Sequence, residues 1–337
     1  MNTDQSEKLP WKLWLVWVLF SSVLIVGVVS ADGEANTMTP FEWAALVLGL
    51  APLMAAQFVL GFPTAAAQVR ARLRTARWPL LFPAGGITGL FLISGLMVEK
   101  FDPYATAIFG VGAFAALGTL RQIEKGKHGL GWADAAVWLL LWIPFDLRWN
   151  HDLWFGMDGF VYNWWAVAIT ILAVIGWYAF RELPDFGYRL IPNMRDLSVG
   201  LLTTAALLAI VVPIGLAVDF ITFPPTELIE PLAVLVYFIG LFLTVAIPEE
   251  LFFRGILLHG LDQMFKRRWV GLLISSLAFG LMHWNNAGDL SAKIAYCSLA
   301  SVAGAFYGWA YRKSGSNILA PVITHTLVDL IWRVLFR

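Results

Sequence analysis

The amino-acid sequence predicts an all-helical protein that spans a membrane many times, and three observations carry this prediction. Of the 337 residues, 59% are apolar and 14% are charged, whereas a soluble protein carries charge on about a quarter of its residues. Apolar segments long enough to cross a bilayer follow one another along almost the whole chain. The basic residues gather in alternate connections between these segments. The expected class is therefore all-α, a polytopic helical bundle surrounded by lipid.

Eleven segments contain the roughly 20 mostly apolar residues that a membrane-spanning helix needs. In chain order they lie at about 12–31, 41–62, 79–98, 103–120, 130–147, 161–180, 197–217, 231–261, 269–285, 292–311 and 318–336. Their orientation follows from the positive charges, because cytoplasmic connections are enriched in lysine and arginine. The N-terminus and every second connection after it hold 18 of the 23 basic residues. This asymmetry predicts a cytoplasmic N-terminus, in the plasma membrane of a prokaryote or the endoplasmic reticulum of a eukaryote.

A polar stretch between the sixth and seventh segments, RELPDFGYRLIPNMRD from Arg181 to Asp196, is typical of a cytoplasmic loop. It predicts an N-terminal region of six spans at 1–190 and a C-terminal region of five spans at 191–337. The role of the first region is not predicted by its sequence. A net charge of zero disfavours nucleic acid as a partner. The single cysteine, Cys297, excludes an intramolecular disulfide and a cysteine-cluster metal site.

The ionisable residues inside the predicted spans are concentrated in the C-terminal region. A charged side chain at the centre of a membrane helix costs at least ~2.5 kcal/mol on insertion scales and usually serves a function. The spans that hold such residues are three separate helices, with Glu249, Glu250 and Arg254 on the first, His283 on the second, and His325 and Asp329 on the third. Measured from the basic cluster at the cytoplasmic end of each span, Glu249, His283 and His325 lie at most roughly 26, 23 and 18 Å deep, at ~1.5 Å per residue.

Spacing along each helix suggests separate roles. Glu250 and Arg254 are four residues apart with the acid first, which is the favourable order for an ion pair along one helix face. Glu249 lies about 100° around the helix from Glu250 and stays available for chemistry. His325 and Asp329 are also four apart, so they share one face. Two imidazoles and one or two carboxylates at one depth suit either a water-activating centre or a hydrolytic metal site.

These residues carry a resemblance to a known family. EELFFR at 249–254 is similar to the EExxxR motif of the CPBP family of intramembrane proteases, also called type II CAAX prenyl endopeptidases or Abi proteins. FGLMH, from Phe279 to His283, resembles the FxxxH motif of that family, and His325 resembles the histidine of its third motif, usually HxxxN. The three motifs follow in family order within roughly residues 230–330. The six N-terminal spans resemble nothing known to us.

The resemblance implies an intramembrane peptidase in which Glu249 is the general base that activates water and His283 is its partner. Glu250, Arg254 and Phe279 would support the site. His325 and the residue four positions later would line it, by stabilising the oxyanion or by contributing to a metal site. This chain has Asp329 where asparagine is usual, and an ionised carboxylate cannot donate a hydrogen bond to an oxyanion. The metal ligands expected for a Zn²⁺ ion, if one binds, are Glu249, His283 and His325, and no organic cofactor is expected.

The leading hypothesis is an endopeptidase that hydrolyses membrane-associated peptide or protein substrates, reached from the membrane or the cytoplasmic side. Some members of the family that it resembles cleave prenylated CaaX tails, but the motifs do not identify the substrate. The alternative is a non-enzymatic membrane protein, either a proton-coupled transporter or an immunity protein against a peptide toxin. Transporters often show broken helices in corresponding positions of two halves. The first six spans contain no counterpart of the PEE segment at 248–250, which disfavours transport.

Overall fold

The computed structural model describes residues 11–31, 38–99, 102–147, 158–223 and 230–336. Within these ranges the chain is all-helical, and no strand occurs. It packs as two compact units, one formed by Met1–Lys127 with Gly131–Pro184 and the other by His128–Leu130 with Asp185–Arg337. The sequence predicts a division into residues 1–190, of unknown role, and residues 191–337, which carry the candidate catalytic residues. This division of roles stays a prediction.

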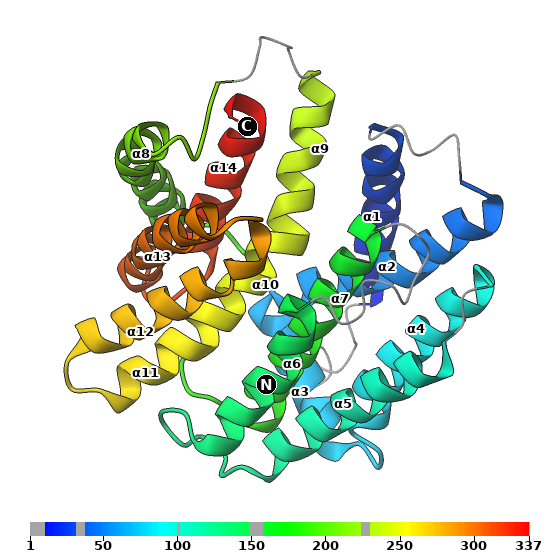
Figure 1. The fold of residues 1–337 in the computed structure, drawn as a ribbon. Helices are drawn as coiled ribbons and strands as arrows, with labels where there is room; N and C mark the ends of the chain where they lie inside the picture. Colours follow the sequence, from blue (N-terminus) through cyan, green and yellow to red (C-terminus); the bar gives the residue numbers. More distant parts are fainter. Residues whose placement is uncertain (1–10, 32–37, 100–101, 148–157, 224–229, 337) are drawn as a thin grey trace. The chain divides into compact units, whose positions relative to one another are not determined.

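The first unit is built around a deeply buried helix. Its elements are α1 (Trp11–Ala31), α2 (Pro40–Leu60), α3 (Pro63–Thr75), η2 (Leu81–Gly85), α4 (Gly86–Met97), α5 (Pro103–Gln122), α6 (Trp132–Asp146), α7 (Asp158–Ala173) and η3 (Val174–Phe180), where η2 and η3 are π-helical (Figure 1). Helix α7 continues into η3 and packs against α2, α5 and α6. The Trp164 side chain is fully buried and donates to the Gly49 carbonyl at 3.2 Å. Apolar packing around α7 and η3 therefore forms the core of this unit.

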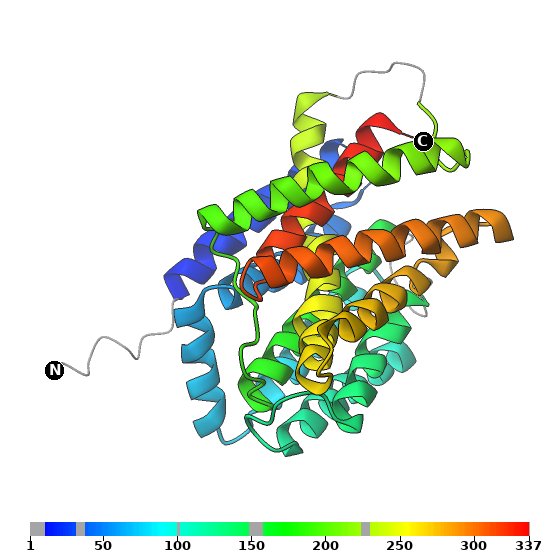
Figure 2. The ribbon, with the colours of Figure 1, turned by 90° about the vertical axis from the view of Figure 1, so that its left-hand side faces the viewer.

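The second unit holds every residue of the expected site. Its elements are α8 (Met194–Ala217), α9 (Pro231–Leu241), η4 (Phe242–Ala246), α10 (Ile247–Glu250), η5 (Leu251–Leu258), α11 (His259–Met264), α12 (Arg268–Leu281), η6 (Trp284–Asn286), α13 (Leu290–Lys313) and α14 (Leu319–Leu335). Helices α8, α13 and α14 pack against one another, and α12 packs against α13 and η5 (Figure 1 and Figure 2). The segment from α9 through α10 contacts α14. This packing brings residues 249–254 and 325–329 to the same place.

Several helices begin where the sequence supplies a cap. Asn193 and Asp289 accept hydrogen bonds from backbone amides in the first turns of α8 and α13, and such caps satisfy donors that a helix start otherwise leaves unpaired. Proline opens α2, α5 and α9 at a position that needs no amide hydrogen. Small residues let helices approach closely inside the unit, as where Gly280 of α12 lies against Ser301 and the Cys297 carbonyl of α13.

Each of the eleven predicted apolar segments coincides with a helix or a continuous helical run. Among the described residues, five helical runs are long and apolar enough to cross a membrane, namely Pro40–Leu60, Pro103–Gln122, Asn163–Phe180, Met194–Ala217 and Pro231–Met264. Two shorter apolar helices occupy Lys12–Gly27 and Leu81–Met97. The membrane class is thus supported by length and composition, while the number of eleven spans and the side of the N-terminus stay predictions.

Candidate active site

The two adjacent glutamates lie in the middle of the continuous helical run Pro231–Met264. Pro248 has no amide hydrogen, and its ring would clash with the carbonyl four residues earlier in a regular α-helix. The backbone is π-helical in η4, directly before this turn, and again in η5, directly after it. Such local widening is frequent at functional sites. It accommodates the proline, and Glu249 and Glu250 occupy the short α-helical turn between the two widened segments.

Glu250 and Arg254 form the ion pair that their spacing predicts. Both side chains are fully buried, and Arg254 Nη1 donates to Glu250 Oε1 at 2.9 Å. The other end of the guanidinium, Nη2, donates to the Gly304 carbonyl of α13 at 3.1 Å. A side chain on Gly304 would lie 3.3 Å from Nη2, so the absence of one leaves room for this contact. Glu250 is thereby committed to holding Arg254.

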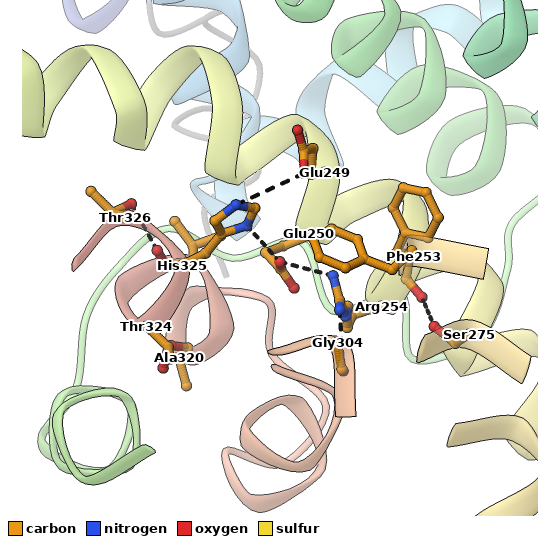
Figure 3. Close-up of polar contacts among 12 residues, drawn as sticks. Glu249, Glu250, Phe253, Arg254, Ser275, Gly304, Ala320, Thr324, His325 and Thr326 are labelled. Carbon is orange, nitrogen blue, oxygen red and sulfur yellow. Dashed lines mark hydrogen bonds and ion pairs between the residues drawn. The ribbon is translucent and has the colours of Figure 1, made fainter. Parts of the chain in front are cut away.

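Aromatic rings surround the guanidinium. Arg254 lies 4.3 Å from the centroid of the Phe279 ring and 5.1 Å from that of Tyr307. A cation over an aromatic face is attracted by the negative charge of the π-system, more so where water is excluded. The neighbouring backbone is held as well, because Ser275 of α12 donates to the Phe253 carbonyl at 2.8 Å (Figure 3). Phe279 therefore contacts the guanidinium directly, and its supporting role stays a prediction.

Three carboxylates surround the His325 imidazole. Its Nδ1 lies 2.8 Å from Glu250 Oε1, and its Nε2 lies 3.8 Å from Glu249 Oε2 and 3.3 Å from Asp329 Oδ2. Figure 3 shows the imidazole between the two glutamates. An ionised carboxylate only accepts hydrogen bonds, so Nδ1 donates to Glu250. A proton on Nε2 is then within reach of both Glu249 and Asp329.

Packing fixes the orientation of this imidazole. Tyr307 stacks on the His325 ring with centroids 4.9 Å apart and planes inclined by 17°, and Phe279 meets it edge-on at 5.8 Å. The His325 side chain is 4% exposed, whereas that of Asp329 is 34% exposed. The expected pairing of His325 with Asp329 across one helix turn is therefore present, with Asp329 on the open side of the ring.

His283 lies at the same site, and its expected partnership with Glu249 stays a prediction. Its Nδ1 lies 2.8 Å from the Phe279 carbonyl, one turn earlier, and the ring packs against Phe279 and Tyr296 at 4.8 and 5.1 Å between centroids. In the described part of the chain, no hydrogen bond or ion pair joins His283 to Glu249. Because a carbonyl accepts, Nδ1 carries the hydrogen, and the Nε2 of a neutral His283 is left as an acceptor.

Glu249 is the carboxylate of the glutamate pair that makes no hydrogen bond within the described part of the chain, whereas Glu250 accepts two through Oε1. The Glu249 side chain is 11% exposed, and Oε2, the oxygen nearest His325, has no hydrogen-bond partner among the described residues. A buried polar atom without a partner is uncommon in folded proteins and calls for an explanation. A catalytic water is one explanation, because a general base must accept a hydrogen bond from it.

The expected metal ligands are not arranged as a ligand set. Over the ranges that the structure describes, no three histidine, cysteine, aspartate or glutamate side chains are grouped as a metal ion requires. Glu249, His283 and His325 thus do not form such a group, and His325 Nδ1 is hydrogen-bonded to Glu250. The binding of Zn²⁺ stays a prediction that needs a direct measurement.

Sequence comparison agrees with the motifs. Residues 231–331 match the family model described as type II CAAX prenyl endopeptidase Rce1-like. This part of the chain is therefore similar to the Rce1-like family. The match covers the described helices from α9 to most of α14, which hold all the site residues, and it confirms the resemblance to CPBP-family proteases. Neither a curated protein nor a solved structure matches the chain significantly. Together with the apolar helices, this match supports an integral membrane protease.

Three residues of the site were not predicted. Tyr307 stacks on His325 and lies near Arg254, Gly304 supplies a carbonyl to Arg254, and Tyr296 packs on His283. All three lie on α13, which carries no acidic, basic or histidine side chain at the site. An aromatic or a glycine in an apolar helix is common for packing alone, so its position gave no signal of function.

Proposed function

We propose that the protein is an intramembrane endopeptidase that hydrolyses a peptide bond with water activated by Glu249. The division of labour between the two adjacent glutamates carries this proposal. Glu250 is fully buried and accepts hydrogen bonds from Arg254 and His325 through Oε1, whereas Glu249 makes no hydrogen bond among the described residues and only faces His325 at 3.8 Å. A carboxylate that structural contacts leave free can accept a proton.

The proposed reaction proceeds in two steps. Water binds at Glu249 Oε2, the carboxylate takes one of its protons, and the water oxygen forms a bond to the carbonyl carbon of the substrate. The π electrons of that carbonyl move to its oxygen, which becomes an oxyanion. Glu249 then gives the proton to the leaving nitrogen, the carbon–nitrogen bond breaks, and the oxyanion collapses to the new carboxyl group. Such proton transfer typically contributes a factor of about 10²–10⁴ to the rate.

The two histidines take different roles in this scheme. His325 donates through Nδ1 to Glu250, and a proton on Nε2 held by Asp329 can be offered to the oxyanion. His283 donates through Nδ1 to a backbone carbonyl, so in its neutral form it accepts a hydrogen bond from water at Nε2. Asp329 is thus a positioning residue for His325. An ionised aspartate has no hydrogen to donate to the oxyanion. In this scheme Asp329 instead accepts the hydrogen bond from His325 Nε2, and this role does not require an asparagine.

The proposed substrates are membrane-associated peptides or proteins. The name of the matched family suggests prenylated CaaX tails as the first class to test. Lipid supplies no water, so the reacting bond must reach Glu249 through a water-accessible opening. Asp329 marks the more open side of the site, since it is the most exposed of the three carboxylates around His325. No step of this mechanism is assigned to a metal, because the residues expected to hold one are not grouped.

The test is hydrolysis of a lipidated CaaX peptide by the purified protein in mild detergent, with product masses identifying the bond cleaved. Each reaction is run with and without a chelator, and bound zinc is measured separately. Cleavage at one internal bond that the chelator does not affect is the expected result. Absence of cleavage across a panel of membrane-associated peptides would reject the proposal. The described residues give no observation that favours a transporter or an immunity protein.

A further inference from the structure

A cluster of basic side chains in the first unit surrounds a single carboxylate, far along the chain from the residues of the candidate active site. Arg70 and Arg74 of α3 and Lys125 of the connection after α5 all pair with Glu182, which follows η3. Arg70 Nη2 lies 3.3 Å from Glu182 Oε2, Arg74 Nε lies 3.1 Å from Oε1, and Lys125 Nζ lies 3.7 Å from Oε1. We name these four residues the Glu182 cluster.

The charges of this cluster do not balance. Three cations surround one anion, so the cluster carries two more positive charges than negative ones. The Glu182 side chain is 15% exposed, whereas those of Arg70, Arg74 and Lys125 are 31, 44 and 56% exposed. Glu182 therefore forms the floor of the cluster, and the cations face outward. A guanidinium has five N–H donors, so most donors of the two arginines remain available to a ligand.

Glu182 is suited to hold the cations in place. Burial alone would raise the pKa of Glu182, but the hydrogen bond from Arg74 and the charges of Arg70, Arg74 and Lys125 outweigh burial and lower it. Glu182 adopts a φ of 54°, which is uncommon for a residue other than glycine. The carboxylate is thus ionised at neutral pH and fixed at a position where the chain reverses. The three basic side chains are gathered by it before any ligand binds.

Exposed aromatic residues lie close in sequence to the cluster. Trp78 follows α3 and is 66% exposed, and Phe82 is 80% exposed. Trp132, at the start of α6, is 93% exposed. Tryptophan is enriched where the hydrocarbon of a bilayer meets the headgroups, and basic residues are favoured beside anionic headgroups. An aqueous partner would leave these rings in water, whereas a lipid covers both the rings and the charges.

We propose that Arg70, Arg74 and Lys125, gathered around Glu182, form a binding site for the phosphate of an anionic phospholipid headgroup. The phosphate accepts hydrogen bonds from the two guanidinium groups, and Lys125 adds a positive charge. The acyl chains lie along the apolar surface that the exposed aromatic residues mark. This site is independent of peptide hydrolysis, so it stands whether or not the proposed function is correct.

The test compares lipid binding by variants of the whole chain in neutral detergent. Phosphatidylglycerol and phosphatidylcholine are added separately, and retained lipid is counted by native mass spectrometry. The double substitution Arg70→Gln/Arg74→Gln is expected to weaken phosphatidylglycerol binding roughly thirtyfold, since each basic residue near an anionic surface contributes about a factor of five. Phosphatidylcholine binding should not change. Lys266→Gln/Arg267→Gln removes two exposed cations of the second unit and serves as the matched control.

A second variant separates an organised site from simple charge attraction. Glu182→Gln adds one unit of net positive charge but releases the three cations. The proposal predicts weaker phosphatidylglycerol binding by this variant, whereas charge attraction alone predicts tighter binding. Tighter binding, or an equal loss in the Lys266→Gln/Arg267→Gln control, would overturn the proposal. Equally effective competition by inorganic phosphate would show a site for free anions and would overturn the assignment to lipid.

Discussion

Replacing Arg254 by methionine tests whether the buried ion pair holds the site together. Methionine keeps much of the apolar stem that packs beside Phe279 and Tyr307 but removes the charge. The substitution strands the Glu250 carboxylate, which is fully buried, and removes the hydrogen bond to the Gly304 carbonyl. Breaking one partner of a buried pair costs about 3–5 kcal/mol. We expect the low end of this range, because His325 still donates to Glu250.

The double substitution Arg254→Met/Glu250→Gln should recover much of this loss. Glutamine is neutral, and its amide oxygen can still accept the hydrogen bond from His325 Nδ1. We therefore expect the two substitutions to be coupled by about 2 kcal/mol or more, within the range measured for residues in one network. The matched control is the exposed pair Glu124 and Lys127, 4.0 Å apart with side chains 77 and 64% exposed. Its coupling should be close to zero.

The assay is reversible unfolding of the purified proteins in mixed micelles, with increasing amounts of a denaturing detergent. Fluorescence and circular dichroism should report the same transition for each variant, so that free energies of unfolding can be compared. Additive effects of Arg254→Met and Glu250→Gln would refute the ion pair. A coupling as small as that of the Glu124–Lys127 control would refute it equally.

Three further predictions address the open side of the site, the Glu182 cluster and the topology. Asp329→Asn should slow hydrolysis by roughly tenfold or more, as is typical when a residue that orients a functional histidine is lost. A variant that is fully active and insensitive to chelators would contradict both this positioning role and a role of Asp329 in binding a metal. The lowered pKa of Glu182 stabilises the fold above the pKa that this residue has when unfolded and ceases to do so as pH falls through its folded pKa. The melting temperature of the wild type in lipid-free detergent should therefore begin to approach that of Glu182→Gln only as pH falls below the ordinary glutamate pKa of about 4.3, and a difference independent of pH would argue against the cluster. In a Cys297→Ala background, Lys127→Cys should react with a membrane-impermeant thiol reagent from the cytoplasmic side and Gly288→Cys from the other side, and labelling of both from one side would refute the eleven-span topology.

The local parts of the site could be predicted from the sequence because helix periodicity fixes them. The four-residue spacing of Glu250 and Arg254, and of His325 and Asp329, places each pair on one helix face, and the structure has both contacts. The separation of Glu249 from Glu250 follows from the same geometry, because consecutive residues point about 100° apart. The position of charged residues inside apolar segments was enough to locate the site within the chain.

The contacts between helices could not be predicted in this way. The bond between His325 Nδ1 and Glu250 joins residues 75 positions apart, and it depends on how α14 packs against the π-helical run around Pro248. The bond from His283 Nδ1 to the Phe279 carbonyl, one turn earlier, was not predicted either. Helix α3 was also not predicted, because only apolar segments long enough to span a membrane were expected to be helices. It has six apolar residues among its 13, four of them alanines, and it carries the arginines of the Glu182 cluster.

The central claim is that Glu249 performs the chemistry while Glu250 maintains the structure, and the most direct test is the hydrolysis rate per folded molecule of two matched variants. Glu249→Gln should lower the rate by about 10²–10⁴, because glutamine cannot accept the proton, and its folded yield and melting temperature should match the wild type. Glu250→Gln should chiefly lower stability and retain measurable hydrolysis in the fraction that folds. Full activity of Glu249→Gln, or loss of activity confined to Glu250→Gln, would contradict the account.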